Sequence, residues 1–186
     1  MTISSTARAT LEDLYREEGK AELIGGRIVR YMASGPQRSA AAGEIFVSLR
    51  LYARARGGVA FGDGVGYAVP ELPSGRESFS PDASYYAGPL PANRMRFIEG
   101  PPTFAAEVRS ENDYGPAAEA ETAAKRADYF AAGTRVVWDV DPVAETVTVY
   151  RAGAPAEGVV YRRGDTAEAE PAVQGWRMAV ADVFAG

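Results

Sequence analysis

The sequence predicts a single α/β (α+β) domain over residues 1–186, in which helices flank a mixed β-sheet. The length of 186 residues suits one domain with its own hydrophobic core. The composition, 46% hydrophobic and 24% charged, is that of an ordinary globular protein. From Asp82 to Val140 the pattern reads strand, strand, helix, strand, and a helix that joins two strands of one sheet crosses a face of that sheet.

The first third of the chain predicts a short helix, a hairpin and a long helix. Thr10 and Asp13 have the spacing of a capping box that starts a helix. Two β-prone runs, Ala21–Ile24 and Arg27–Met32, are separated by two glycines, which is typical of a tight hairpin. From Gln37 to Arg56 apolar residues recur at steps of three and four, which indicates a helix with one apolar side. These residues are Ala41, Ile45, Leu49 and Tyr52.

The rest of the chain alternates short strands with one further helix. This alanine-rich helix runs from about Pro116 to Ala132, with a proline suited to its first turn and Gly133 to end it. Asp139 and Asp141 are expected to shape the turn before Pro142. Strands are expected at Val59–Phe61, Val65–Val69, Asp82–Tyr86, Phe104–Val108, Thr134–Val140, Thr146–Tyr150 and Val159–Tyr161, with a final turn near Val180–Phe184.

Cysteine and histidine are both missing, and this narrows the available chemistry. Without cysteine there is no disulfide, thiolate zinc site or thiol nucleophile. Without histidine there is no Ser-His catalysis and no usual general base at neutral pH. Any catalysis must therefore depend on Asp, Glu, Lys, Arg, Tyr and Ser side chains.

The chain is expected to act in the cytoplasm. Residues Met1–Arg8 show no basic region followed by an apolar run, so no secretory signal is indicated. No stretch has the apolar length of a membrane span. The net charge of -5 argues against broad, non-specific attachment to nucleic acid. This net charge is compatible with a local basic groove, because the electrostatic potential at a surface depends on where the charges lie.

Two acidic residues in neighbouring strands are the first candidates for a metal site. Glu107 lies in the apolar run Phe104–Val108, where a buried carboxylate is costly unless a cation or hydrogen-bond partner accompanies it. Strand alternation directs Glu107 and Ala105 to one face of the sheet. Asp82 opens the preceding strand, although an aspartate after Pro81 is also common in turns. At one sheet end the two carboxylates would share Mg²⁺ (or Mn²⁺), because the available ligands are oxygens.

Lys125 is one of only two lysines, the other being Lys20, and it lies on the helix that follows Glu107. An ammonium near a metal site steadies an attacking water or the developing charge of the phosphorane. The alternative for Lys125 is an exposed salt bridge with Glu121, one helical step before it. Arg109 is a second candidate cation, because it follows Glu107 by two residues and faces the same way.

Three further residues are weaker candidates for the same site. Glu22, in the first hairpin, would add a third carboxylate, although a residue in such a position is more commonly exposed. Asp113 and Tyr129 would line the site, Tyr129 mainly as a packing residue with its hydroxyl at the edge. Trp138 and Trp176 are expected in the core, which weighs against a two-carboxylate glycosidase with exposed tryptophans in a sugar cleft.

Six segments occur in an order and spacing that together are fairly specific. They are Glu22–Val29, Pro81-Asp82, Glu107–Ser110, Lys125 with Tyr129–Gly133, Trp138–Pro142, and the tail from Gly175-Trp176 to Phe184. Over nearly the whole chain they resemble the Uma-two family of putative restriction endonucleases, which belongs to the PD-(D/E)xK nuclease superfamily.

This resemblance implies a restriction-endonuclease-like fold and Mg²⁺-dependent hydrolysis of phosphodiester bonds in DNA. Carried over by motif, Asp82 and Glu107 would be the metal ligands, Lys125 the catalytic cation and Glu22 an auxiliary residue. The lysine that the superfamily has two residues after the glutamate is Arg109 here. A guanidinium stays protonated, so Arg109 would bind phosphate but would not act as a general base.

The alternative to an enzyme is a catalytically degenerate nuclease fold that serves as a binding or assembly module. Two departures from the family pattern bear on it: the replacement of the lysine by Arg109, and the absence of the histidine that the family often has near Arg38. DNA is the expected partner, no membrane partner is expected, and a homodimer is left open. If the enzyme hypothesis holds, Asp82, Glu107 and Lys125 should lie together in one cleft.

Overall fold

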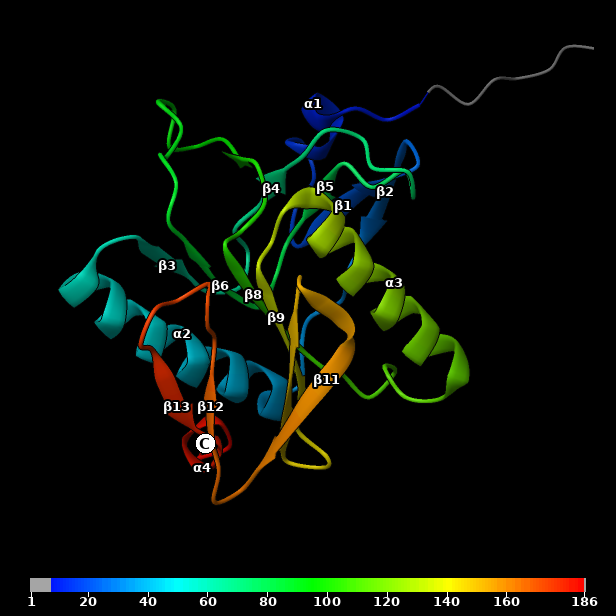
Figure 1. Cartoon of the computed structure of the whole chain (residues 1–186). Coiled ribbons are helices and arrows are strands. Elements are labelled where there is room, and N and C mark those ends of the chain that lie inside the picture. Colours follow the sequence, from blue (N-terminus) through cyan, green and yellow to red (C-terminus); the bar gives the residue numbers. More distant parts are fainter. Residues whose placement is uncertain (1–7, 186) are drawn as a thin grey trace, which may run out of the picture.

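A six-stranded mixed sheet forms the centre of the computed structural model, which describes residues 8–185 (Figure 1). Its strands are β3 (Val59–Phe61), β6 (Ala83–Tyr86), β8 (Phe104–Val108), β9 (Val136–Asp141), β10 (Thr146–Arg151) and β11 (Ala154–Arg162). Their order across the sheet is β11-β10-β9-β8-β6-β3, with β8 parallel to β9 and the other neighbours antiparallel. The predicted mixed sheet is confirmed. The expectation that Met1–Arg8 is not a secretory signal rests almost wholly on residues 1–7, which lie outside the described part.

Two long helices cover opposite faces of this sheet (Figure 1). α2 (Pro36–Arg56) packs on the face to which Ala106 of β8 contributes, and α3 (Pro116–Ala132) covers the face to which Ala105 contributes. The predicted alternation of side chains along β8 is therefore confirmed, and so are the two helices. The same alternation places Glu107 on the α3 side of the sheet.

The predicted hairpin is formed by β1 (Ala21–Ile24) and β2 (Arg27–Arg30). Gly25 and Gly26 connect the strands with φ angles of 59° and 68°. Residues with a Cβ rarely adopt two successive positive φ values, so the two glycines determine this turn. The hairpin turns Glu22 of β1 into the interior, where it is fully buried.

The remaining elements are short. They are α1 (Leu11–Leu14), β4 (Tyr67–Ala68), β5 (Ser78–Phe79), β7 (Ile98–Glu99), β12 (Thr166–Glu168), β13 (Arg177–Ala179) and α4 (Val180–Val183). β5, β4 and β7 form a small sheet, and β12 pairs with β13. α1 begins with the predicted capping box of Thr10 and Asp13. Strands of two residues have no detectable periodicity, which is why β5 and β7 were not predicted.

β11 runs from Ala154 to Arg162, so it is longer than the predicted strand Val159–Tyr161 and includes Gly158. A Cβ at Gly158 would come 2.7 Å from the side chains of Thr148 and Tyr150 on the neighbouring β10. Glycine commonly weakens a strand, but here it permits the close approach of two strands. The strand therefore continues through this residue.

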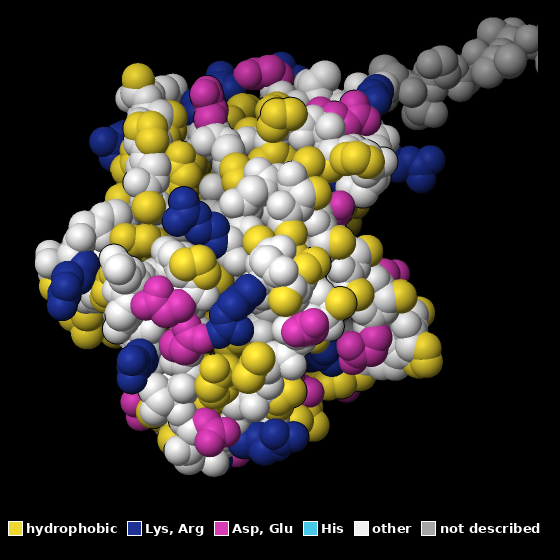
Figure 2. Space-filling model, in the orientation of Figure 1, with side chains coloured by type: hydrophobic (Ala, Val, Ile, Leu, Met, Phe, Trp, Pro, Cys, Tyr) yellow, Lys and Arg dark blue, Asp and Glu magenta, His cyan; other side chains and the backbone are white. Residues whose placement is uncertain are grey.

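Charges of both signs are interspersed on the face of the molecule drawn in Figure 2. This pattern fits the modest net charge of -5. Trp138 and Trp176 lie below the surface, stacked with ring centroids 4.9 Å apart, so both are core residues as predicted. None of the helices within residues 8–185 is long and apolar enough to cross a membrane.

Candidate active site

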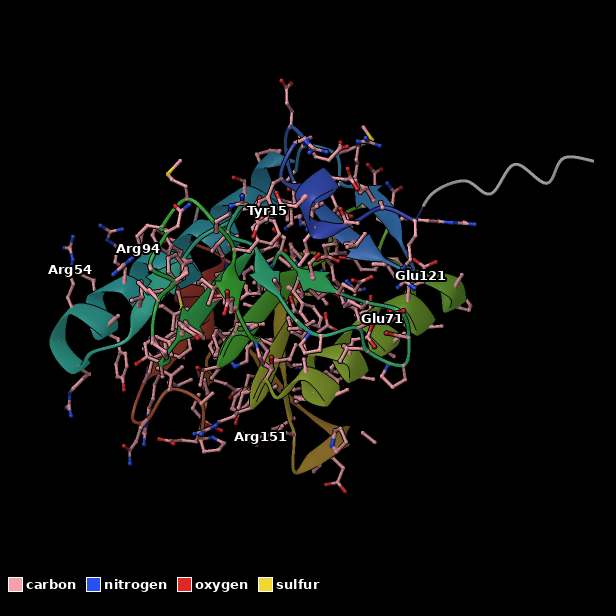
Figure 3. The ribbon with its side chains drawn as sticks, turned by 90° about the horizontal axis from the view of Figure 1, so that it is seen from above. Tyr15, Arg54, Glu71, Arg94, Glu121 and Arg151 are labelled. Atoms are coloured by element: carbon pink, nitrogen blue, oxygen red, sulfur yellow. The ribbon has the colours of Figure 1, made fainter. Side chains whose placement is uncertain are left out.

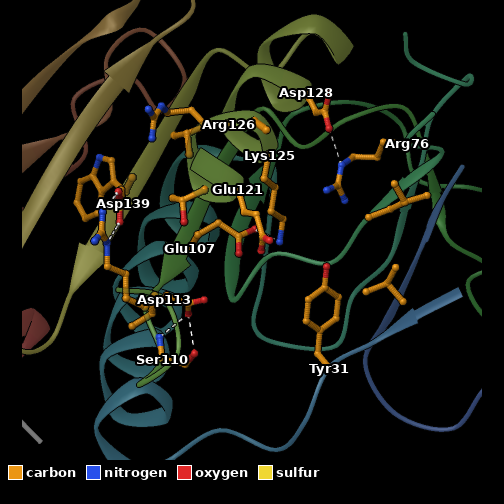
Figure 4. Close-up of a pocket in the computed structure, with 18 of the residues that line it drawn as sticks. Tyr31, Arg76, Glu107, Ser110, Asp113, Glu121, Lys125, Arg126, Asp128 and Asp139 are labelled. Carbon is orange, nitrogen blue, oxygen red and sulfur yellow. Dashed lines mark hydrogen bonds and ion pairs between the residues drawn. The ribbon is translucent and has the colours of Figure 1, made fainter. Parts of the chain in front are cut away.

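Figure 4 shows the side chain of Lys125 beside Glu107. Lys125 also forms an ion pair with a second carboxylate, that of Glu22. The Nζ atom of Lys125 is 2.9 Å from Oε1 of Glu107 and 3.2 Å from Oε1 of Glu22. The lysine side chain is only 18% exposed, so the alternative of an exposed pair with Glu121 is wrong. Burial disfavours the ammonium, but the charges of Glu107 and Glu22 outweigh burial and raise the pKa of Lys125.

The carboxylate of Glu107 has one oxygen that is held by the protein and one that is free. Oε1 accepts hydrogen bonds from the hydroxyl of Tyr129 at 2.5 Å and from Lys125. Oε2 has no hydrogen-bond partner within residues 8–185. Burial raises the pKa of Glu107, and the nearby charge of Asp82 adds to this effect against the opposing effect of Lys125. The ring of Tyr129 packs face to face with Phe79, which confirms its predicted packing role. Its hydroxyl also contacts Glu107 in the site.

Glu22 is completely buried and fully hydrogen bonded, so the alternative that it is simply an exposed hairpin residue is wrong. Its Oε2 accepts from the hydroxyl of Tyr31 at 2.8 Å and from the guanidinium of Arg76. Its Oε1 accepts from the main-chain N–H of Ser80 at 2.9 Å and contacts Lys125. Burial opposes ionisation, but these partners outweigh burial and lower the pKa of Glu22 to about 2. Glu22 thus positions Lys125 and offers no free oxygen to a ligand.

Asp82 lies at the same end of the sheet as Glu107, and it also contacts two cations. Ala83 pairs with Ala106 on β8, which places Asp82 beside Glu107. The Asp82 side chain is 2% exposed. It accepts hydrogen bonds from Nζ of Lys20 at 2.6 Å, from Nη2 of Arg38 at 3.0 and 3.1 Å, and from the main-chain N–H of Val108 at 2.8 Å. Burial acts against ionisation, but the two cations prevail and lower the pKa of Asp82.

Two cavities at this end of the sheet share a lining residue. The large cavity, of about 480 Å³, is lined by Glu107 and Lys125, and the small cavity, of about 180 Å³, is lined by Asp82. Arg38 lines both. The predicted convergence in one cavity is therefore met for Glu107 and Lys125, whereas Asp82, although it lies beside Glu107 in the sheet, lines the small cavity. Asp113 lines the large cavity, as predicted.

Arg109 lines the large cavity but is paired with other carboxylates. Its Nε and Nη2 atoms donate to Asp139 at 2.8 Å each, and its Nη1 and Nη2 atoms donate to Glu119. It makes no ion pair with Glu107. Asp139 was expected to shape a turn, and this is wrong because it lies inside β9, where its side chain reaches Arg109. Asp141 does shape the turn, since it accepts from the N–H groups of residues 143 and 144.

The residues present fit a magnesium ion better than a metal that needs a complete protein cage. The oxygen donors at this sheet end are the carboxylates of Asp82 and Glu107 and the main-chain carbonyl of Val108. Within residues 8–185 no three acidic side chains are grouped closely enough to hold a metal by themselves. Mg²⁺ commonly takes only one or two protein carboxylates and completes its shell with water and substrate phosphate.

Three cations that contact the carboxylates of this region were not among the predicted site residues: Lys20, Arg38 and Arg76. Arg76 donates to Asp128 at 2.9 Å as well as to Glu22, which ties the loop before β5 to α3. For Lys20 a signal existed, because the scarcity of lysine that drew attention to Lys125 applies equally to it. For the two arginines no such signal is present.

Comparisons with known proteins give a family model that matches most of the chain and several similar solved structures, one of which is described below. The model of the Uma2 (Uma-two) family, described as "Putative restriction endonuclease", matches residues 8–181. The solved structure of a putative nuclease of DUF820 from Anabaena variabilis ATCC 29413 is similar to the chain, with a TM-score of 0.72 and 21% sequence identity. The similarity covers 95% of this chain and 97% of the other, and it shows a shared fold. No curated protein matches the chain.

Proposed function

The chain belongs to the Uma2 family, and from this premise we propose that it is an endonuclease that hydrolyses phosphodiester bonds of DNA with Mg²⁺ (or Mn²⁺) as cofactor. The observation that carries the proposal is the contact of Lys125 with Glu107 on the wall of a cavity. Asp82 lies beside Glu107 at the end of the adjacent strand. Two carboxylates and an ammonium in this arrangement suit the cleavage of a negatively charged diester.

Each residue of the site has a distinct part in this proposal. A bound divalent cation supplies positive charge that polarises the phosphate and activates water. Asp82 and Glu107 would hold this cation. Lys125 stays protonated because of its raised pKa, so it donates hydrogen bonds to phosphate oxygens and stabilises developing negative charge. The Tyr129 hydroxyl holds Oε1 of Glu107, which leaves Oε2 for a ligand.

Titration calorimetry tests the metal site directly. The wild type is expected to bind Mg²⁺ and Mn²⁺ saturably, and Asp82→Asn is expected to remove this binding because a ligand charge is lost. The same two proteins are then assayed on supercoiled, linear and single-stranded DNA, where only the wild type should cleave. Asp182→Asn, at an exposed position on α4, is the matched control and should behave as wild type. Failure of the wild type to bind either ion would refute the enzyme proposal.

A binding module without catalysis is the second candidate, and one observation favours it. Both oxygens of Asp82 already accept hydrogen bonds from Lys20, Arg38 and Val108. If these contacts persist in all conditions, the chain binds DNA without cleaving it. A binding module would retain the same DNA affinity in Asp82→Asn, and its affinity would not change when Mg²⁺ is added.

Arg126 is expected to contact a phosphate of the bound DNA. It lines the large cavity, its Cζ lies 3.6 Å from the centre of the Tyr150 ring, and within residues 8–185 it has no carboxylate at salt-bridge distance. Arg126→Ala is expected to weaken DNA binding roughly tenfold, which corresponds to the loss of one charged hydrogen bond. The slope of log binding constant against log salt concentration should fall in magnitude by about one, because one phosphate contact is lost. Fluorescence anisotropy at several salt concentrations measures both quantities.

Arg54→Ala is the control for this experiment, because Arg54 lies at the far end of α2 and points away from the molecule (Figure 3). It should change DNA affinity much less than Arg126→Ala. Equal losses in the two variants would show that Arg126 contributes only to the overall charge.

A further inference from the structure

The guanidinium of Arg38 occupies the oxygen atoms that a metal ion would need. Its Nη2 atom donates to both carboxylate oxygens of Asp82, at 3.0 and 3.1 Å. Its Nε atom donates to the main-chain carbonyl of Val108 at 2.7 Å. Its Nη1 atom donates to the hydroxyl of Ser34 at 3.1 Å. All three nitrogens are thus engaged, and two of them contact oxygens of the proposed metal site.

The hydrogen-bonding capacity of Asp82 is used up in this arrangement. A carboxylate has about four lone-pair sites. Asp82 receives two hydrogen bonds from Arg38, one from Lys20 and one from the main-chain N–H of Val108. A divalent cation therefore cannot bind Asp82 unless one of these donors leaves.

Of the three donors, only Arg38 lines both cavities, so its departure is the one that would open Asp82 toward the large cavity. The N–H of Val108 belongs to the backbone of a central strand, so it is fixed. Lys20 is 12% exposed and is held by a second carboxylate, Asp63, at 2.9 Å. Arg38 lies on the walls of both cavities, the small one that Asp82 lines and the large one that Glu107 lines. In the large cavity it would meet Asp113, whose Oδ1 atom has no hydrogen-bond partner in the described chain.

We propose that Arg38 is a resident counter-cation of the metal site: its guanidinium neutralises Asp82 in the metal-free protein and competes with the divalent ion for Asp82. This inference rests on the proposed function. Displacement of the side chain joins the two cavities and exposes Asp82 and Glu107 to the same ion. Arg38 thereby lowers metal affinity and sets the concentration at which the site fills.

Metal titration of Arg38→Gln tests the inference, with free Mn²⁺ followed by electron paramagnetic resonance. Removal of one charged competitor is expected to tighten Mn²⁺ binding roughly ten- to a hundredfold. Arg54→Gln, on the same helix, should bind as wild type does. In the double variant with Asp82→Asn the gain should disappear. A gain that persists without Asp82 would overturn the proposal.

The other outcomes separate this inference from the proposed function. Equal binding by wild type and Arg38→Gln would overturn the inference and leave the metal-dependent function intact. Binding by neither protein would overturn both. If Arg38→Gln does not fold, Ser34→Ala serves instead, because it removes only one neutral contact of the guanidinium. It should tighten Mn²⁺ binding by roughly two- to tenfold, and no change would overturn the inference.

Discussion

Glu107→Gln is expected to lower the rate of DNA hydrolysis by roughly a thousandfold or more without lowering the stability of the fold. The loss follows from removing one of the two carboxylates proposed to hold the metal. The unchanged stability follows from the raised pKa of Glu107, which shows that the folded protein disfavours its ionised form. A neutral glutamine of the same shape still accepts a hydrogen bond from Tyr129, and Lys125 keeps its contact with Glu22.

Cleavage of supercoiled DNA and thermal unfolding of the same samples measure the two effects. Glu121→Gln is the matched control, because Glu121 lines the same cavity from α3 and has no salt-bridge partner within residues 8–185. It should retain activity and stability. Retained cleavage in Glu107→Gln would place Glu107 outside the chemistry. A marked fall in its unfolding temperature would show that Glu107 stabilises the fold, which would contradict the inference from its raised pKa.

Regular elements were predictable where local residues determine them. α3 runs from Pro116 to Ala132 as predicted, because a proline suits its first turn and Gly133 ends it with a φ of 114°. β8 was recognised by its apolar run. β4 was predicted within Val65–Val69, but its partners β5 and β7 were not, because these two-residue strands are stabilised by tertiary contacts and not by local sequence.

The site was predictable in its carboxylates but not in all of its cations. Glu107 was conspicuous because an acidic residue inside an apolar strand requires a partner, and Lys125 was conspicuous because lysine is scarce. Arg38 is one of many arginines, and it meets Asp82 only because α2 crosses the sheet so that its first turn lies at the end of β6. Contacts of this kind depend on how whole elements pack, which local pattern does not reveal.

Glu22→Gln is expected to destabilise the fold by about 3 kcal/mol at pH 7, in contrast to Glu107→Gln. The pKa of Glu22 falls from 4.5 to about 2 on folding, and each pKa unit corresponds to about 1.4 kcal/mol. Glutamine would also leave the buried cations of Arg76 and Lys125 without the charge that compensates them. The two glutamates thus differ in role: Glu22 stabilises the site, and Glu107 is kept in it at a cost in stability.

The pH dependence of this effect provides the sharper test. Because folding lowers the pKa of Glu22, its contribution is complete above about pH 4.5 and is lost as the pH falls through about 2. Urea unfolding at pH 7, 5, 4 and 3 should therefore show a gap between wild type and Glu22→Gln that falls to less than half at pH 3. Glu12→Gln, which breaks an exposed pair with Arg96, should shift stability by less than about 1 kcal/mol at every pH. A gap that stays constant down to pH 3 would mean that the hydrogen-bonding shape of Glu22, and not its charge, stabilises this network.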